Sequence, residues 1–209
     1  MMSVAETRAF FNARANGWSE RCWQGRDARD AGAVERGLRR FLSPLPIRES
    51  DALLDVGCGD GVLVPHLLPR LGPDGLLVEL DVAEKMIECN RQRHRDPRLR
   101  FIVADVADCA LAPASFDGIL CFSCFPHFPD PRETLAVLAI LLRPHGWLAV
   151  CHLNSSTEMN EIHAGADPAV HADRLPCAPA LAAMFAEAGL HVSQAVDEPG
   201  FYLVFGSPV

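Results

Sequence analysis

The chain has 209 residues, 49% of them hydrophobic, and carries a formal net charge of −8 with a pI of about 5.4. A chain of this length can bury the core of one α/β domain, and its acidic balance without a basic stripe argues against a nucleic-acid partner. No apolar run approaches the roughly 20 residues that span a bilayer, and the first residues lack an apolar signal core, so we expect a cytoplasmic protein without a membrane partner. Eight cysteines are spread through predicted strands and helices, which favours reduced thiols.

The first 45 residues precede the first predicted strand and carry two groups of apolar side chains. Phe10, Phe11 and Trp18 come first, and residues 34–42 follow with apolar side chains at helical spacing. The aromatic rings either pin a helix to the sheet or form a lid that keeps water from a ligand, and both alternatives stay open. We predict a helical lid or cap over residues 1–45 and a ligand-binding domain over residues 46–209.

The most informative stretch runs from Leu53 to Leu68. Its apolar start predicts a buried strand, and its end from Val62 predicts a helix. Between them, glycines occupy alternate positions in Gly57-Cys58-Gly59-Asp60-Gly61, where a ligand can approach bare backbone. A dinucleotide-binding turn has the spacing G-x-G-x-x-G and holds a pyrophosphate, whereas this turn is G-x-G-x-G and follows Asp55. Because an acid repels a pyrophosphate, the turn favours a cationic or hydroxyl-rich ligand and disfavours an NAD-dependent oxidoreductase.

Three further strands are predicted downstream, and two of them lead to an acid. The strand over residues 75–81 ends at Asp81, about twenty residues after the glycine turn, which is the offset at which an acid reaches a ribose diol. Asp81 can also cap the following helix, and the two roles are compatible. The next strand begins at Leu99 and leads to Asp105, and a fourth covers residues 116–122.

These four segments, in this order, resemble the motifs of the class I S-adenosylmethionine (SAM) dependent methyltransferases of the small-molecule type. The stretch from Phe10 to Trp18 resembles an opening seen in many of these enzymes. The resemblance implies SAM as cofactor, with its amino-acid end near Asp55, its ribose at Asp81 and its adenine near Met86 and Asp105. The cofactor-binding residues that it implies are Asp55, Gly57, Cys58, Gly59, Asp81, Val82, Met86, Asp105, Val106 and Phe122.

The rest of the chain continues the alternation of helices and strands. Asp130 is placed to cap a helix that starts at Pro131, and residues 143–146 resemble the family's turn into a fifth strand. A helix over about residues 179–188 precedes two closing strands near residues 191–196 and 201–205. We predict a single-domain α/β fold with a doubly wound, Rossmann-like sheet of seven mostly parallel strands and an antiparallel edge strand.

The methyl acceptor is expected beyond the carboxyl ends of the fourth and fifth strands, because ligands on such sheets bind there. These ends lack the acid or Asn followed by Pro-Pro and an aromatic residue that DNA and many protein amide methyltransferases carry. They contain His127 and His152, and a histidine titrates near neutral pH. Methyl transfer needs the acceptor aligned and deprotonated, so we predict His127 and His152 as catalytic residues that act on a small-molecule acceptor.

Two other interpretations stay open. A non-catalytic SAM-binding or sensor module would keep the cofactor pocket and lack transfer chemistry. Alternatively, a metal in the site, or an acceptor containing a metal or metalloid, would use nitrogen donors of His127, His152 and His163, although their spacing matches no metal-binding motif. We predict no resident metal, and a monomer or homodimer.

Overall fold

The protein folds around one seven-stranded sheet in a computed structural model, which describes residues 2–24 and 32–209. The strands lie in the order β3-β2-β1-β4-β5-β7-β6. Their bounds are β1 Ala52–Val56, β2 Leu76–Asp81, β3 Leu99–Val103, β4 Phe116–Phe122, β5 Leu142–His152, β6 Leu190–Glu198 and β7 Phe201–Pro208. Strands β1 to β5 are parallel, and β7 is antiparallel to both β5 and β6. The predicted fold class is confirmed, and the pair β6–β7 forms the edge beside β5.

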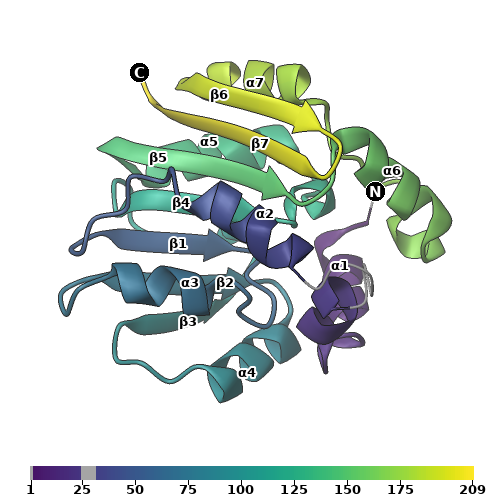
Figure 1. Cartoon of the computed structure of the whole chain (residues 1–209), viewed down its shortest axis with the longest axis horizontal. Coiled ribbons are helices and arrows are strands. Elements are labelled where there is room, and N and C mark those ends of the chain that lie inside the picture. Colours follow the sequence, from purple (N-terminus) through teal and green to yellow (C-terminus); the bar gives the residue numbers. More distant parts are fainter. Residues whose placement is uncertain (1, 25–31) are drawn as a thin grey trace.

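Helices cover both faces of this sheet (Figure 1). Their bounds are α1 Val4–Asn12, α2 Ala33–Leu42, α3 Val64–Leu67, α4 Glu84–Arg93, α5 Pro131–Leu141, α6 Ser156–Gly165 and α7 Ala178–Glu187. Short helical turns are η1 Glu20–Gln24, η2 Leu68–Arg70, η3 Val106–Asp108, η4 Phe125–His127 and η5 Pro168–Val170. In the part of the chain that the structure describes, no helix combines the length and the apolar character needed to cross a membrane.

The two faces of the sheet bury different residues of the same strands. Leu54 and Ile119 pack with α5 and α7, whereas Leu53 and Leu120 pack with α2 and α3. Burial on both faces explains why the strands are almost continuously apolar instead of alternating. On α2, the Phe41 ring stacks on Phe122 with centroids 5.9 Å apart. The second half of the predicted cap therefore packs into the core. Residues 1 and 25–31 of the predicted cap lie outside the described residues.

Several predicted boundaries hold and two shift. The Asp130 carboxylate accepts hydrogen bonds from the N–H groups of Arg132 and Glu133, which confirms the predicted helix start. The helix expected over residues 62–68 is only α3, followed by η2, because Pro69 has no N–H to continue an α-helix. Residues 143–146 form an irregularity inside β5, since the register with β4 passes from Leu142 to Trp147. The eight cysteines, all within the described residues, form no disulfide.

Candidate active site

A cavity of about 290 Å³ lies at the carboxyl ends of β1, β2 and β4. Its floor consists of the glycine turn after β1 and the residues that follow β2 and β3, and its cover comes from α1, Trp18, η4 and α6. In Figure 1, α1 and α6 lie beyond the tips of the strand arrows. Parallel strands present their carboxyl ends on one side of the sheet, so residues far apart in the sequence meet there.

The glycine turn and Asp81 form one unit in the cavity wall. Gly57 and Gly59 adopt left-handed φ angles of 64° and 56°, a region that favours glycine. A Cβ on Gly57 would lie 2.5 Å from the Cβ of Cys124, so this position has no room for a side chain. One carboxylate oxygen of Asp81 accepts the N–H of Gly59 at 2.9 Å, and the other accepts the N–H of Ala83 at 2.8 Å. The structure thus brings together the two features that the sequence analysis paired.

Three acids are buried beneath this turn. Asp55 and Glu79 are partners in the register between β1 and β2, and burial raises the pKa of both carboxyl groups. Burial also raises the pKa of Asp81 to about 6, against the opposing effect of its two backbone hydrogen bonds. Glu79 accepts a hydrogen bond from the Asn90 side-chain amide at 2.7 Å. Asp55 lines the cavity, and its Oδ2 has no hydrogen-bond partner among the described residues, so a ligand ammonium or hydroxyl group would satisfy it.

The other predicted cofactor residues also line the cavity: Cys58, Val82, Met86, Asp105, Val106 and Phe122. Met86 and Val106 are each 1% exposed and provide an apolar wall that suits a flat ring. The Asp105 carboxylate accepts the N–H of Ala107 at 3.1 Å, which caps η3. All ten residues predicted around the cofactor are therefore gathered in one place.

His127, at the end of η4, lines the same cavity with a partner that the sequence analysis missed. Its Nδ1 lies 2.8 Å from Oδ2 of Asp173, whose side chain is 1% exposed. A carboxylate only accepts hydrogen bonds, so Nδ1 carries the proton and Nε2 of the neutral ring keeps a lone pair. Phe11 meets the imidazole edge-on with centroids 5.1 Å apart. A histidine oriented by a buried carboxylate in this way is suited to accept a proton.

Two more histidines line the cavity. His152, at the end of β5, is fully buried, and its ring meets Tyr202 edge-on at 5.9 Å. His163, on α6, has its ring centroid 5.2 Å from that of His127. Within residues 2–24 and 32–209, no three His, Cys, Asp or Glu side chains are arranged to hold a metal ion. The geometry therefore lends no support to the metal alternative.

Two hydroxyl groups in the cavity wall were not predicted. The side-chain oxygens of Thr7 on α1 and Ser123 after β4 are buried and lack a hydrogen-bond partner in the described parts of the chain. Ser123 also has a φ of 54°, which is uncommon for a residue with a side chain and is often found at functional sites. Hydroxyl residues are frequent in any sequence, and only the fold reveals which ones face a ligand.

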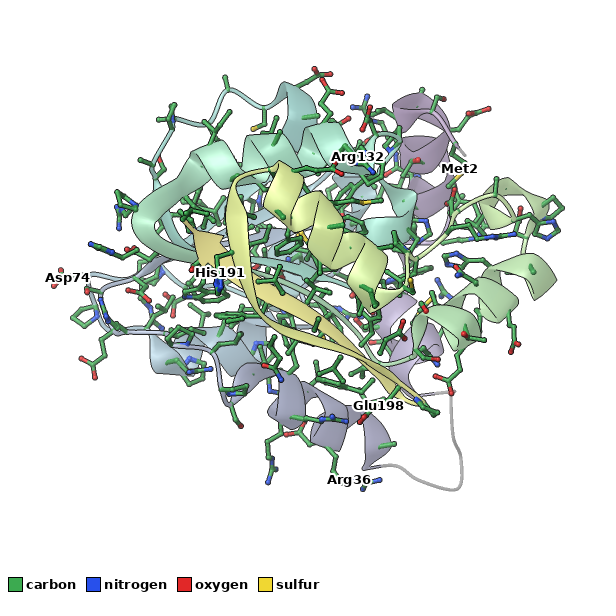
Figure 2. All side chains as sticks on the ribbon, turned by 90° about the horizontal axis from the view of Figure 1, so that it is seen from above. Met2, Arg36, Asp74, Arg132, His191 and Glu198 are labelled. Atoms are coloured by element: carbon green, nitrogen blue, oxygen red, sulfur yellow. The ribbon has the colours of Figure 1, made fainter. Side chains whose placement is uncertain are left out.

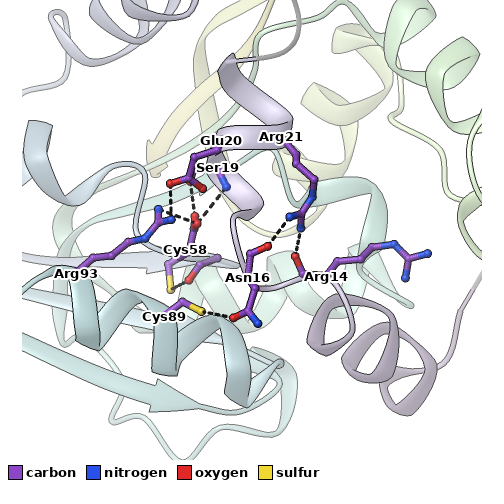
Figure 3. A network of polar contacts seen from close by, with 10 residues as sticks. Arg14, Asn16, Ser19, Glu20, Arg21, Cys58, Cys89 and Arg93 are labelled. Carbon is purple, nitrogen blue, oxygen red and sulfur yellow. Dashed lines mark hydrogen bonds and ion pairs between the residues drawn. The ribbon is translucent and has the colours of Figure 1, made fainter.

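A polar network attaches the N-terminal segment to the glycine turn (Figure 3). Asp60, within the turn, accepts hydrogen bonds from the N–H of Ser19 at 3.0 Å and from its hydroxyl group. Arg93 on α4 pairs with Asp60 at 2.9 Å and with Glu20 at 2.6 Å. Trp18 meets Phe11 edge-on at 5.4 Å. The cover is thus fixed to the same turn that forms the cavity floor.

These observations fit SAM. The turn offers bare backbone, the Asp81 carboxylate can accept ribose hydroxyls, and the unpaired oxygen of Asp55 suits an amino group. The sheet order, the glycine turn and the acids at the end of β2 and after β3 together match the layout of the class I SAM-dependent methyltransferase fold. Comparison with known families agrees, since residues 54–150 match the methyltransferase domain family.

Individual relatives extend the comparison. The 27-O-demethylrifamycin SV methyltransferase of Amycolatopsis mediterranei (strain S699) is 31% identical over 132 residues, which cover 61% of this chain and 48% of the relative. The nocamycin O-methyltransferase of Saccharothrix syringae is 35% identical over 52% of this chain and 40% of its own length. The chain thus spans about half the length of the curated relatives that it matches.

A solved structure shares the fold over nearly the whole chain. It is a SAM-dependent methyltransferase of Thermotoga maritima, described as a possible histamine N-methyltransferase, with a TM-score of 0.75 and 17% sequence identity. The match covers 97% of this chain and 100% of that one. The N-terminal and C-terminal elements outside residues 54–150 therefore belong to the same fold.

Proposed function

We propose that the protein is an enzyme that transfers the methyl group of SAM to a hydroxyl oxygen of an apolar small molecule, with His127 as the general base. One observation carries this proposal: the pair His127–Asp173 lines the same cavity as the glycine turn and Asp81. The surrounding wall is mainly apolar, with Phe10, Phe128 and Ile162 among its residues. Relatives named O-methyltransferases support oxygen as the methylated atom.

The cofactor half of the proposal uses the ten predicted residues. Gly57 and Gly59 would let the cofactor approach the backbone, Asp81 would accept its ribose hydroxyls, and Asp55 would face its amino group. Met86, Val106 and Phe122 would enclose the adenine and the methionyl chain with apolar surface. A cytoplasmic location and a monomer or homodimer stay predictions from the sequence.

The acceptor half depends on proton transfer and on the exclusion of water. When bound, SAM supplies a methyl group on a positively charged sulfur, which leaves as S-adenosylhomocysteine when the acceptor oxygen attacks. His127 Nε2 would take the proton of the attacking hydroxyl, and the Asp173 carboxylate would stabilise the resulting imidazolium. His152 would be a second acceptor-side residue, deeper in the wall. The aromatic cover would keep water from competing with the acceptor.

Calorimetry and product release test the two halves separately. Titration with SAM and with S-adenosylhomocysteine measures cofactor binding, and S-adenosylhomocysteine release over a panel of hydroxylated acceptors measures transfer. The variant His127→Asn keeps a donor where Nδ1 lies and removes Nε2, so we expect kcat to fall about 10²- to 10⁴-fold with unchanged SAM affinity. His191→Asn, on the exposed side of β6 and far from α6 in Figure 2, is the matched control.

Each failure has its own meaning. Absence of heat with both SAM and S-adenosylhomocysteine would overturn the cofactor assignment. SAM binding without product release over the panel would contradict transfer and favour a SAM-binding sensor module.

A further inference from the structure

We propose that His163 is a specificity-determining residue that selects acceptors carrying a second hydrogen-bond donor beside the methylated hydroxyl. This inference rests on the proposed function and adds the class of acceptor. It concerns a side chain that the base mechanism leaves unused, although it lines the same cavity and is 7% exposed.

The hydrogen bond of His163 to the main chain fixes which ring nitrogen holds the proton. Its Nδ1 lies 3.0 Å from the main-chain oxygen of Asp173. A carbonyl oxygen only accepts, so Nδ1 is the donor, and Nε2 of the neutral ring is an acceptor. Burial lowers the pKa of His163, which keeps this ring neutral at pH 7.

One residue anchors both histidines. Asp173 holds His127 through its carboxylate and His163 through its carbonyl, and the two rings lie 5.2 Å apart. Asp173 is fully buried behind the rings, while both rings line the cavity. In an imidazole ring the Nε2 lone pair points away from Nδ1, so with each Nδ1 at Asp173 we infer that each Nε2 faces the cavity. Among the described residues, no group donates a hydrogen bond to either Nε2.

The cavity therefore presents two neighbouring acceptors to whatever binds beside the cofactor. A molecule with one hydroxyl satisfies one ring, shuts the other ring off from water and leaves its acceptor unpaired, which is unfavourable. A molecule with two hydroxyls, or with a hydroxyl and an N–H, on adjacent or next-but-one carbons satisfies both. Phe10, Phe128 and Ile162 favour an apolar, ring-containing skeleton for this molecule.

The two rings differ in what supports them, and this difference sets which hydroxyl reacts. His127 faces a carboxylate that stabilises a positive ring, whereas His163 faces a neutral carbonyl. The hydroxyl at His127 would lose its proton and gain the methyl group, and the donor at His163 would keep its hydrogen. The product would then be a single ether with its second donor intact.

Three matched compounds test this inference: 2,3-dihydroxynaphthalene, 3-methoxy-2-naphthol and 2-naphthol. Their binding is measured by calorimetry to protein saturated with S-adenosylhomocysteine, and turnover with SAM is measured in parallel. We expect the dihydroxy compound to bind about tenfold more tightly than the other two. His163→Asn keeps a donor toward Asp173 but has no acceptor at the Nε2 position, so it should lose this preference. His163→Gln can place its amide oxygen there and should restore part of it, while His191→Asn should behave as wild type.

Three outcomes would overturn the role of His163. They are equal affinity of the wild type for the three compounds, the same preference in His163→Asn, and no binding of any of the compounds. If His163 had a purely structural role, both variants would bind the three compounds equally more weakly than the wild type does. That result would also contradict the proposed selectivity. The proposed function would survive these outcomes as long as SAM binds and S-adenosylhomocysteine is released in a His127-dependent manner.

Discussion

The floor and the cover of the cavity are built on different principles. The floor consists of strand ends, where the backbone of the glycine turn and the Asp81 carboxylate are held by the sheet register. The cover is held by side-chain contacts across long stretches of chain: His127 to Asp173 spans 46 residues and Glu20 to Arg93 spans 73. A floor made of backbone suits a ligand that stays the same, such as the cofactor. Side chains of the cover lie on separate elements, so substitutions there can alter which second ligand binds without altering the sheet.

The strongest test of this division is a change in the cover that leaves the floor intact. In Asp173→Asn, the charge that orients His127 is lost, and we expect kcat to fall about 10²- to 10³-fold while the Kd for SAM stays within about twofold. Steady-state kinetics and calorimetry on the same preparation check both numbers. Asp74→Asn, in an exposed loop, is the control. An equal loss of SAM affinity would show that the two halves are not separable.

The converse change is made in the floor. Asp81→Asn should weaken SAM binding about 10- to 100-fold at pH 8, because in the proposed binding mode the ribose hydroxyls would lose a charged acceptor. Burial raises the pKa of Asp81 to about 6, so wild-type affinity should fall as the pH drops through 6 and this carboxylate becomes protonated. Calorimetry between pH 5 and 8 measures the effect. Any pH dependence that persists in the variant belongs to Asp55 and Glu79, whose carboxyl pKa values are also raised, and an unchanged wild-type affinity down to pH 5 would refute this role of Asp81.

A smaller effect is expected where the cover meets the floor. Arg93→Met removes the ion pairs to Asp60 and Glu20 and leaves the Asp60 side chain, 1% exposed, without its cation. We expect SAM to dissociate about tenfold faster and the amides of residues 10–18 to exchange hydrogen faster, because the N-terminal segment opens more often. Stopped-flow fluorescence and hydrogen exchange report these changes. Arg39→Met removes an exposed i,i+4 pair with Glu35 and should leave the SAM dissociation rate and the hydrogen exchange unchanged. Identical behaviour of the two variants would argue that the polar network does not hold the N-terminal segment in place.

The smallest effect concerns stability beneath the floor. Burial raises the folded-state pKa of Glu79, so the native protein binds its proton more tightly than the unfolded chain, and this residue reduces stability as the pH rises above its unfolded pKa. Glu79→Gln removes the buried charge and still accepts from Asn90, so Tm should rise by roughly 3 °C at pH 8 and change little at pH 5. Thermal unfolding at the two pH values measures this difference. A lower Tm at pH 8, with exposed Glu35→Gln unchanged, would show that the charge is needed in the fold.

The same division explains what could be predicted from the sequence. The floor follows from local patterns: alternate glycines after an apolar strand, an acid at the end of the next strand, and the order of the strands. These patterns placed Gly57, Gly59 and Asp81 correctly around one cavity, because a parallel sheet brings its strand ends together. The helix start at Asp130 was equally local, since capping depends on only a few residues.

The cover could be predicted only in part. The aromatic residues 10, 11 and 18 and the histidines at 127 and 152 were singled out, but Asp173 was missed because it lies in an irregular stretch after α6 with no motif around it. Thr7, on α1, and Ser123, directly after β4, gave no signal because no motif surrounds either hydroxyl group. The extent of α3 was overestimated because the apolar spacing outweighed Pro69, which ends the α-helix.

The place of β7 has a consequence for how the chain folds during its synthesis. Strand β6 is made first, yet it touches the sheet only through β7, and the edge of β5 stays open until β7 arrives. A nascent chain that ends before Phe201 therefore exposes an unpaired apolar edge of the kind that pairs with other chains. Because β7 inserts between β5 and β6, which are both made before it, the sheet closes only when the last strand is complete. A ribosome that stalls shortly before that point would release an aggregation-prone intermediate.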